Sequence, residues 1–236
     1  KYLISMWNAF VEAFRLLETL DANMLGIVSL SLSVSICALC IGCLLGIPLG
    51  AFIAIKKFTG RQATIIALNS LMAVPTVIVG VVIYLLLSRS GPLGNLGWLF
   101  TPKGMTLAQT TLTTPLIAAL TRQIIEDAWY THGETFLALK LSTLSKLKWL
   151  SWDCRFSLSI AVLAGFARAI SEVGAVMIVG GNISNATRTM TTAIALETSK
   201  GDLPLALALG FVLLGVVLLA NLLTSILRSV TEKRYG

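Results

Sequence analysis

Residues 156–179 read FSLSIAVLAGFARAISEVGAVMIV, an apolar stretch that is interrupted by Arg168 and Glu172. A short basic segment precedes it at residues 136–150, and the polar run GGNISNATRTMTT follows it at 180–192. The hydrocarbon core of a bilayer needs about 20 apolar residues per helix, so residues 156–179 are long enough to cross it. Together the three segments predict a basic helix at the membrane surface that leads into a span carrying charge.

The composition extends this prediction to the whole chain. Hydrophobic residues make up 56% of the 236 residues and charged residues only 12%, whereas an ordinary soluble domain carries about 25% charged residues. We therefore expect an all-α integral membrane protein that forms one membrane domain over residues 1–236. The net charge is +7, but Lys and Arg lie between the apolar stretches as topology signals do, which argues against nucleic-acid binding.

The apolar stretches predict five transmembrane helices, and these lie at residues 24–55, 63–87, 105–121, 156–179 and 203–227. Residues 1–21 carry an apolar stripe with charges beside it, which predicts an amphipathic helix that lies in the membrane interface or docks against a partner. Lys and Arg are more frequent after the first, third and fifth spans than on the opposite side. The positive-inside rule then places the N-terminus outside and the C-terminus in the cytoplasm, in a multi-pass protein of the cell (inner) membrane.

Several positions within the spans suggest close packing or a pathway. Small residues recur at every fourth position from Ala38 to Ala54, which gives one smooth helix face for another backbone, either in the same chain or in a second copy. The second span holds Pro75 and Thr76. A proline at membrane depth frees backbone groups that neighbours or water must satisfy. We therefore treat both residues as candidates for a translocation pathway, with a packing kink as the alternative.

Arg168 and Glu172 are four residues apart, so on one helix they would share a face and could pair. Charge at membrane depth is costly and is by default a functional candidate, here for the translocation pathway, with a structural ion pair as the alternative. Asn182, Arg188 and the threonines between 187 and 192 offer hydrogen-bond donors to an anion at the outer mouth.

Sequence patterns for catalysis are missing from the chain. It has no G-x-x-x-x-G-K-[ST] phosphate loop, no H-E-x-x-H and no G-x-S-x-G motif. Its four cysteines form no disulfide or metal pattern, and its single histidine, His132, is expected to be solvated. We expect no catalytic residue, metal or cofactor in this chain. The alternatives are a membrane-embedded enzyme that uses Arg168 and Glu172, and a secondary carrier, although no internal repeat typical of carriers is evident.

The segment 134–153 and the span that follows it to residue 183 resemble the permease subunits of bacterial and archaeal ABC importers for oxyanions. Within that group, RTMTTAIALETSKGD at 188–202 is most similar to the tungstate permeases, which are relatives of the molybdate and sulfate permeases. The resemblance covers nearly the whole chain. It implies the type I importer fold and transport of tungstate, with molybdate or sulfate as the alternative.

The family's cytoplasmic signature begins with Glu-Ala-Ala and is followed by a glycine and then Leu-Pro. Glu134 matches the glutamate, but Thr135-Phe136 replaces the alanines, Lys140 takes the glycine position and Trp152-Asp153 replaces Leu-Pro. The resemblance implies that two separate ATPase subunits, which bind ATP and Mg²⁺, clasp the helix at 136–150. The coupling residues that we expect there are Glu134, Ala138, Lys140, Leu141, Ser142, Leu144 and Lys146. The resemblance also implies a homodimeric pore in membrane lipid and an extracytoplasmic binding protein that delivers the oxyanion.

Overall fold

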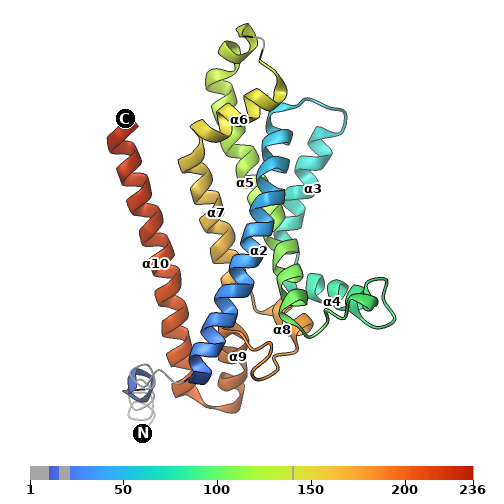
Figure 1. Ribbon diagram of the computed structural model, residues 1–236, viewed down its shortest axis with the longest axis vertical. Coiled ribbons are helices and arrows are strands. Elements are labelled where there is room, and N and C mark those ends of the chain that lie inside the picture. Colours follow the sequence, from blue (N-terminus) through green and yellow to red (C-terminus); the bar gives the residue numbers. More distant parts are fainter. Residues whose placement is uncertain (1–10, 16–21, 140, 236) are drawn as a thin grey trace. The chain divides into compact units, whose positions relative to one another are not determined.

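The computed structural model describes residues 11–15, 22–139 and 141–235, and every element in these ranges is a helix. The helices are α2 (Ala22–Ile55), α3 (Arg61–Ala73), α4 (Thr76–Leu87), the short 3-10 helix η1 (Gly94–Leu96), α5 (Pro102–Ala138), α6 (Thr143–Asp153), α7 (Arg155–Ile170), α8 (Gly174–Gly180), α9 (Met190–Lys200) and α10 (Leu203–Tyr235) (Figure 1). Residues 11–15 are also helical, and the rest of the predicted amphipathic helix at 1–21 lies outside the described residues. The all-α prediction is confirmed for the described part of the chain.

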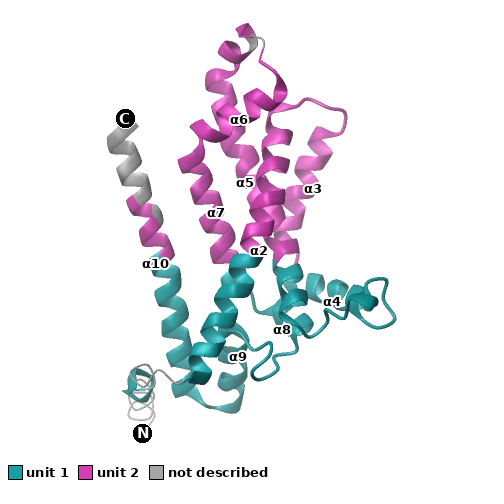
Figure 2. Cartoon of the chain, viewed as in Figure 1, with its two compact units in different colours: residues 1–37, 76–109, 170–219 teal, residues 38–75, 110–169, 220–236 magenta. Residues whose placement is uncertain are grey.

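Two compact units divide the chain, and each is assembled from three separate segments (Figure 2). Unit 1 comprises residues 1–37, 76–109 and 170–219, and unit 2 comprises residues 38–75, 110–169 and 220–236. Helices α2, α5 and α10 each contribute their N-terminal part to unit 1 and their C-terminal part to unit 2. Neither unit is therefore a contiguous stretch of sequence.

In the part of the chain that the structure describes, two helices, α2 and residues Leu203–Leu223 of α10, are long and apolar enough to cross a membrane alone. They coincide with the predicted first and fifth spans. The 34 residues of α2 extend over about 50 Å at 1.5 Å per residue, which exceeds the roughly 30 Å of a hydrocarbon core. The pairs α3 with α4 and α6 with α7 reach that length and hydropathy only when each bent pair is taken as one span. The count of five spans stays a prediction.

Two of the predicted spans are not single helices. The second, at 63–87, is interrupted at Val74 and Pro75 between α3 and α4. Proline has no N–H to donate and pushes the preceding residue out of the helical region, and Val74 is indeed extended, with φ −63° and ψ 131°. The fourth span, at 156–179, stops at Ile170, where α7 ends, and α8 begins at Gly174.

The predicted helix at 136–150 is wrong as a single element, because α5 ends at Ala138 and α6 begins at Thr143. Ser142 accounts for the new start, since its hydroxyl oxygen accepts a hydrogen bond from Ser145 N at 3.2 Å and caps α6. α5 is a 37-residue helix that contains the predicted third span, 105–121, and continues through residues expected to form a joint. Within unit 2, α6 and α7 are bent by 78° at the break between them.

In unit 2 the small-residue face of α2 packs directly against α5. A Cβ atom on Gly46 would lie 2.9 Å from the carbonyl oxygen of Thr114, and one on Gly50 would overlap the carbonyl oxygen of Ala118. Backbones that approach this closely leave no room for a side chain. The predicted close-packing face is confirmed, and the contact lies within one chain.

In unit 1 the helices α4 and α8 approach each other in the same way. A Cβ atom on Gly80 would lie 2.8 Å from Ala175 Cα, and one on Gly174 would lie 2.9 Å from Thr76 Oγ1. A small buried core joins α2, α5 and α8, and it consists of Val34, Met105 and Val176.

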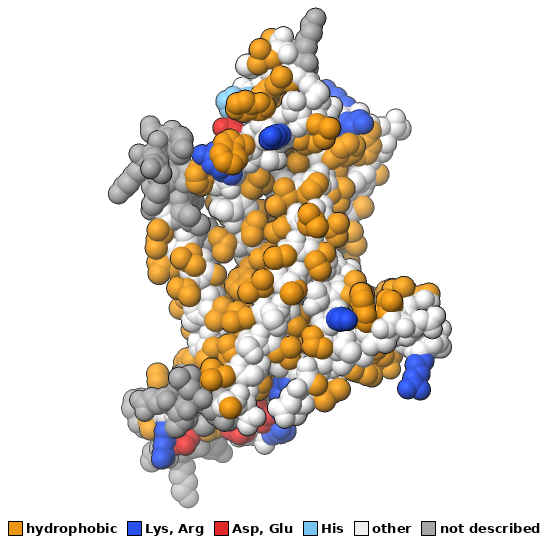
Figure 3. Space-filling model, viewed as in Figure 1, with side chains coloured by type: hydrophobic (Ala, Val, Ile, Leu, Met, Phe, Trp, Pro, Cys, Tyr) orange, Lys and Arg blue, Asp and Glu red, His pale blue; other side chains and the backbone are white. Residues whose placement is uncertain are grey.

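Large hydrophobic side chains are exposed on α2, α4 and α10, for example Leu44, Leu85 and Leu218. Figure 3 shows hydrophobic side chains over much of the face that it draws, with few charged ones between them. Contiguous apolar surface of this kind is unusual on a protein surrounded by water. Apolar side chains are favourable in contact with lipid chains, so the exposed surface agrees with a membrane location.

We expect Gly50→Ala to destabilise the fold and Gly215→Ala to be tolerated. Both glycines are in helices, where alanine is intrinsically favoured by about 1 kcal/mol. A Cβ atom on Gly50 would overlap Ala118, whereas one on Gly215 would have no neighbour within 4 Å, and overpacking typically costs about 1–3 kcal/mol. Thermal unfolding of the two variants in detergent measures the difference. Equal melting temperatures would contradict the close approach of α2 and α5.

Candidate functional site

Glu172 lies in the break between α7 and α8 and is almost fully buried, with 3% of its surface exposed. Its carboxylate accepts a hydrogen bond from Ala175 N at 3.0 Å, in the first turn of α8. Its backbone carbonyl accepts a hydrogen bond from the Thr191 hydroxyl at 2.8 Å. The N–H groups at a helix start lack partners within the helix and favour negative charge. Glu172 therefore accepts a hydrogen bond from an N–H group at the start of α8, and it also connects the break to α9.

Arg168 is partly buried in the last turn of α7. The prediction that Arg168 and Glu172 share one helical face is wrong, because α7 ends at Ile170, between them. Arg168 belongs to unit 2 and Glu172 to unit 1. Each is a charged residue within an otherwise apolar stretch, where charge is costly. Their assignment to a translocation pathway stays a prediction.

Hydroxyl groups at the start of α9 form a buried network in unit 1. Thr189 N donates to Thr192 Oγ1 at 3.0 Å, and the Thr189 hydroxyl lies 3.2 Å from that of Thr191. Met190 N donates to Ser31 Oγ on α2 at 2.7 Å. These contacts satisfy backbone donors that a helix start leaves open. The threonines are thus engaged in the structure rather than presented to an anion, which corrects the expectation for them.

Asn182 and Arg188 belong to the loop that connects α8 to α9. Asn182 adopts a left-handed backbone conformation, with φ 49°, and its side-chain amide donates to Thr192 O at 3.3 Å. Arg188 precedes Thr189, the N-cap of α9, and lines a cavity of about 550 Å³ in unit 1. Its Nε atom is buried and has no hydrogen-bond partner. Of the predicted donors in this loop, Arg188 is the one that lines this cavity.

Pro75 and Thr76 lie at the break between α3 and α4. Pro75 is exposed, and Thr76 is the first residue of α4. Thr76 lies where α4 approaches Gly174 of α8, so its hydroxyl belongs to a helix contact within unit 1. A role for either residue in a pathway stays a prediction.

The predicted coupling residues lie at the junction of α5 and α6 in unit 2. Glu134 and Ala138 are exposed near the end of α5, and Leu144 is 79% exposed on α6. Leu141 is half-buried between the two helices. Lys140 lies outside the described residues. The junction therefore carries both charged and apolar side chains on its surface.

Aromatic residues that are not among the predicted coupling residues surround this junction. Trp129 and Phe136 stack with ring centroids 6.2 Å apart, and Lys146 Nζ lies 5.6 Å from the centroid of the Trp129 ring. Such a cation over an aromatic face is attracted by the ring quadrupole. Trp149 and Trp152 are exposed on α6, three residues apart, and that spacing is the sequence signal that could have identified them. A buried cluster anchors α6 to α2 and α5, and it consists of Ala51, Ala54, Ile125 and Leu150.

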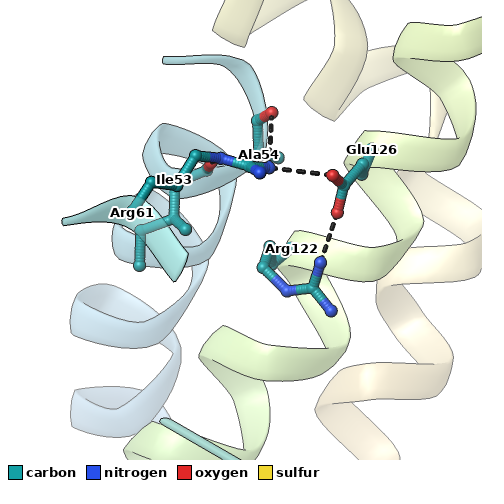
Figure 4. Close-up of polar contacts among 5 residues, drawn as sticks. All are labelled: Ile53, Ala54, Arg61, Arg122 and Glu126. Atoms are coloured by element: carbon teal, nitrogen blue, oxygen red, sulfur yellow. Dashed lines mark hydrogen bonds and ion pairs between the residues drawn. The ribbon is translucent and has the colours of Figure 1, made fainter. Parts of the chain in front are cut away.

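An ion-pair cluster in unit 2 ties α2, α3 and α5 together (Figure 4). Arg61 Nη2 lies 2.8 Å from Glu126 Oε1, and Arg122 pairs with the other carboxylate oxygen. Arg61 also donates to the carbonyl oxygens of Ile53, at 2.8 Å, and Ala54, at 3.4 Å. These carbonyls belong to the last turn of α2, which lacks helical donors. Arg122 and Glu126 are four residues apart on α5, whereas 65 residues separate Arg61 from Glu126 and put that contact beyond the reach of a local pattern.

The two regions are suited to different tasks. The cavity in unit 1 has an arginine and neutral polar groups that suit an anion. The junction in unit 2 exposes aromatic side chains, Trp149 and Trp152, of the kind enriched in protein interfaces. Among the described residues, no group of three or more His, Cys, Asp or Glu side chains is placed to hold a metal ion.

No family model matches the chain. The chain is 41% identical over 214 residues to the tungstate uptake system permease protein TupB of Peptoclostridium acidaminophilum, an alignment that covers 91% of this chain and 94% of that one. It is 37% identical over 231 residues to a probable anion ABC transporter permease protein of Haloferax volcanii, with 92% and 97% covered. It is 34% identical to TupB of Campylobacter jejuni, with 94% and 93% covered.

A weaker similarity extends to the sulfate transport system permease protein CysW of Escherichia coli, at 28% identity over 82% of this chain and 71% of that one. The stronger matches run through nearly the full length of both chains, so they include the broken α7–α8 segment, the α9 loop and the junction of α5 and α6 together. The chain therefore belongs to the family of anion ABC transporter permeases that includes the tungstate uptake permeases.

Proposed function

We propose that this chain is the transmembrane permease subunit of an ATP-driven importer and that it translocates tungstate or a closely related oxyanion. The observation that carries the proposal is the 41% identity to a tungstate uptake permease over 91% of this chain. Sulfate is the second candidate because sulfate permeases are also relatives, although at only 28% identity. Molybdate, whose tetrahedral dianion resembles tungstate in shape and charge, is the third.

The importer would contain further subunits. Two copies of this chain would form the pore, two separate ATPase subunits would bind ATP and Mg²⁺, and an extracytoplasmic protein would deliver the oxyanion. The missing phosphate loop supports a separate ATPase. The distribution of Lys and Arg supports an outer N-terminus and a cytoplasmic C-terminus, which puts the junction of α5 and α6 on the cytoplasmic side, within reach of an ATPase.

The junction has the contacts needed to transmit a displacement of α6 to α2 and α5. Leu150 of α6 is fully buried against Ala51 and Ala54 of α2 and Ile125 of α5. Because protein interiors are closely packed, a displacement of α6 would be passed to both helices rather than absorbed. Closure of the ATPases on ATP would in this way bias the helices between outward-open and inward-open arrangements.

ATPase capture tests the assembly. We expect the double variant Leu144→Glu and Lys146→Glu to lose co-purification with a candidate ATPase subunit that the unmodified chain retains, because it places two acidic groups on α6, at the junction proposed to contact the ATPase. Leu93→Glu is the control, since Leu93 is an exposed leucine in the loop after α4. Capture by the double variant at the level of the control would place the ATPase contact elsewhere.

Arg168 is expected to act in transport and not in assembly. Arg168→Ala should reduce tungstate uptake by the assembled importer at least about tenfold, because losing a hydrogen bond to a charged group costs roughly 1.5–3 kcal/mol. Capture of the ATPase should be unchanged. Arg89→Ala is the matched control, because it removes an exposed arginine from a loop. Normal uptake by Arg168→Ala would remove this residue from the pathway.

A further inference from the structure

The cavity of about 550 Å³ in unit 1 brings together residues from distant parts of the sequence. One wall is the first turns of α2, a second is the loop before α9, and a third is the start of α10. The lining residues are Ala22, Asn23, Met24, Gly26, Ile27, Leu30, Ser184, Asn185, Ala186, Arg188 and Leu205. Only one of them is charged, and it is Arg188.

Arg188 lacks the partners that a partly buried arginine normally has. For the described residues, the structure records neither a hydrogen bond nor an ion pair of its side chain, and Nε is closed off from solvent without an acceptor. Asp202 lies three residues before Leu205, which lines the cavity. Its carboxylate already accepts a hydrogen bond from Leu205 N at 3.3 Å. Withdrawing a polar group from water without a partner costs roughly 1–3 kcal/mol. An incoming anion would remove that cost.

The backbone holds Arg188 in place before any ligand arrives. Arg188 N donates to Ile183 O at 3.1 Å. The neighbouring Thr187 hydroxyl donates to Gly180 O at 2.5 Å and accepts from Ile183 N at 3.0 Å. Binding therefore requires little ordering of the loop, and preorganisation of this kind lowers the entropic cost of binding.

The other polar groups around the cavity suit an anion as well. Ala22 and Met24 belong to the first turn of α2, and the positive end of a helix dipole favours negative charge there. Ser184 and Asn185 add a hydroxyl and an amide. The apolar side chains of Ile27, Leu30 and Leu205 lower the local polarity, which strengthens an interaction with charge.

We propose that this cavity is an oxyanion-binding subsite, in which Arg188 holds a hydrated tetrahedral dianion on its way into the permease. The inference rests on the proposed function, because the transported oxyanion is the ligand. A water molecule takes up about 30 Å³, so a cavity of about 550 Å³ has room for a small anion together with several water molecules. The bound ion would therefore keep part of its hydration shell. One arginine without a closed cage gives weak binding, and a transport site must release its ion as readily as it takes it up.

The test uses the full-length chain in phosphatidylcholine nanodiscs, with inorganic tungstate as the titrant in calorimetry. We expect Arg188→Gln to weaken tungstate binding at least about tenfold, the loss of one charged hydrogen bond. Arg89→Gln removes the same charge from an exposed loop of unit 1 and should bind like the unmodified chain. Equal binding by the two variants, or no binding by the unmodified chain, overturns the subsite.

A second variant fills the space instead of removing the charge. Gly26 lines the cavity, and a Cβ atom on it would meet no atom within 4 Å. Gly26→Leu should therefore fold normally, since leucine also favours a helix, while it excludes the hydrated anion and weakens binding as Arg188→Gln does. Undiminished binding by Gly26→Leu would contradict the location of the site.

Lipid phosphate has the same chemistry as a free oxyanion, so a parallel titration uses nanodiscs that contain phosphatidylglycerol. Tungstate binding that persists there supports the subsite, whereas its loss assigns the cavity to a lipid headgroup and overturns the proposal. Uptake by the complete importer separates the two levels of inference. If the importer takes up tungstate but tungstate binding does not depend on Arg188, the subsite alone is overturned. If tungstate binding depends on Arg188 but the importer shows no uptake, the subsite is supported and the proposed function is overturned.

Discussion

Backbone N–H and C=O groups that lie away from water must find hydrogen-bond partners within the protein, and in lipid this requirement is strict. It is most demanding at the break between α7 and α8, where a helix stops inside apolar sequence. The Glu172 carboxylate accepts from Ala175 N, and the Glu172 carbonyl accepts from the Thr191 hydroxyl. In unit 1 a charged residue and a hydroxyl thus give partners to backbone groups that the break leaves open. The Thr191 contact also ties the first turn of α9 to this break.

Unit 2 meets the same requirement through close packing and ion pairs. The glycines of α2 let its backbone approach α5, and Arg61 both satisfies the last carbonyls of α2 and pairs with Glu126. This arrangement gives the junction of α5 and α6 a firm base, while its outer surface exposes Leu144, Trp149 and other large side chains. A closely packed junction with an exposed apolar surface is suited to bind a partner whose movement it passes to the membrane helices. In the proposed importer that partner is the ATPase.

Long-range patterns were predictable from the sequence, whereas local breaks and distant contacts were not. Continuous hydropathy and a four-residue repeat of small residues identified α2 and its packing face, because such patterns sum over many residues. The end of α7 at Ile170 was missed because residues 156–179 are apolar enough overall to predict one continuous span, and Glu172 was assigned to that helix rather than to the break, where its carboxylate accepts from Ala175 N. Arg188 was predicted as a donor to an anion, and that role stays a prediction. The cavity that it lines could not be predicted, because its other wall includes Asn23, more than a hundred residues earlier and beyond the reach of any local pattern.

Reconstituted transport tests the central claim most directly. The chain would be assembled with its ATPase and its binding protein in proteoliposomes, and accumulation of tungstate would be measured with and without ATP. The proposed function requires that accumulation depend on ATP and on both partners, and that excess molybdate compete for uptake more strongly than excess sulfate, because its dianion is closer to tungstate in size. Tungstate accumulation by the chain alone, without ATPase or ATP, would contradict the importer assignment and favour a stand-alone carrier.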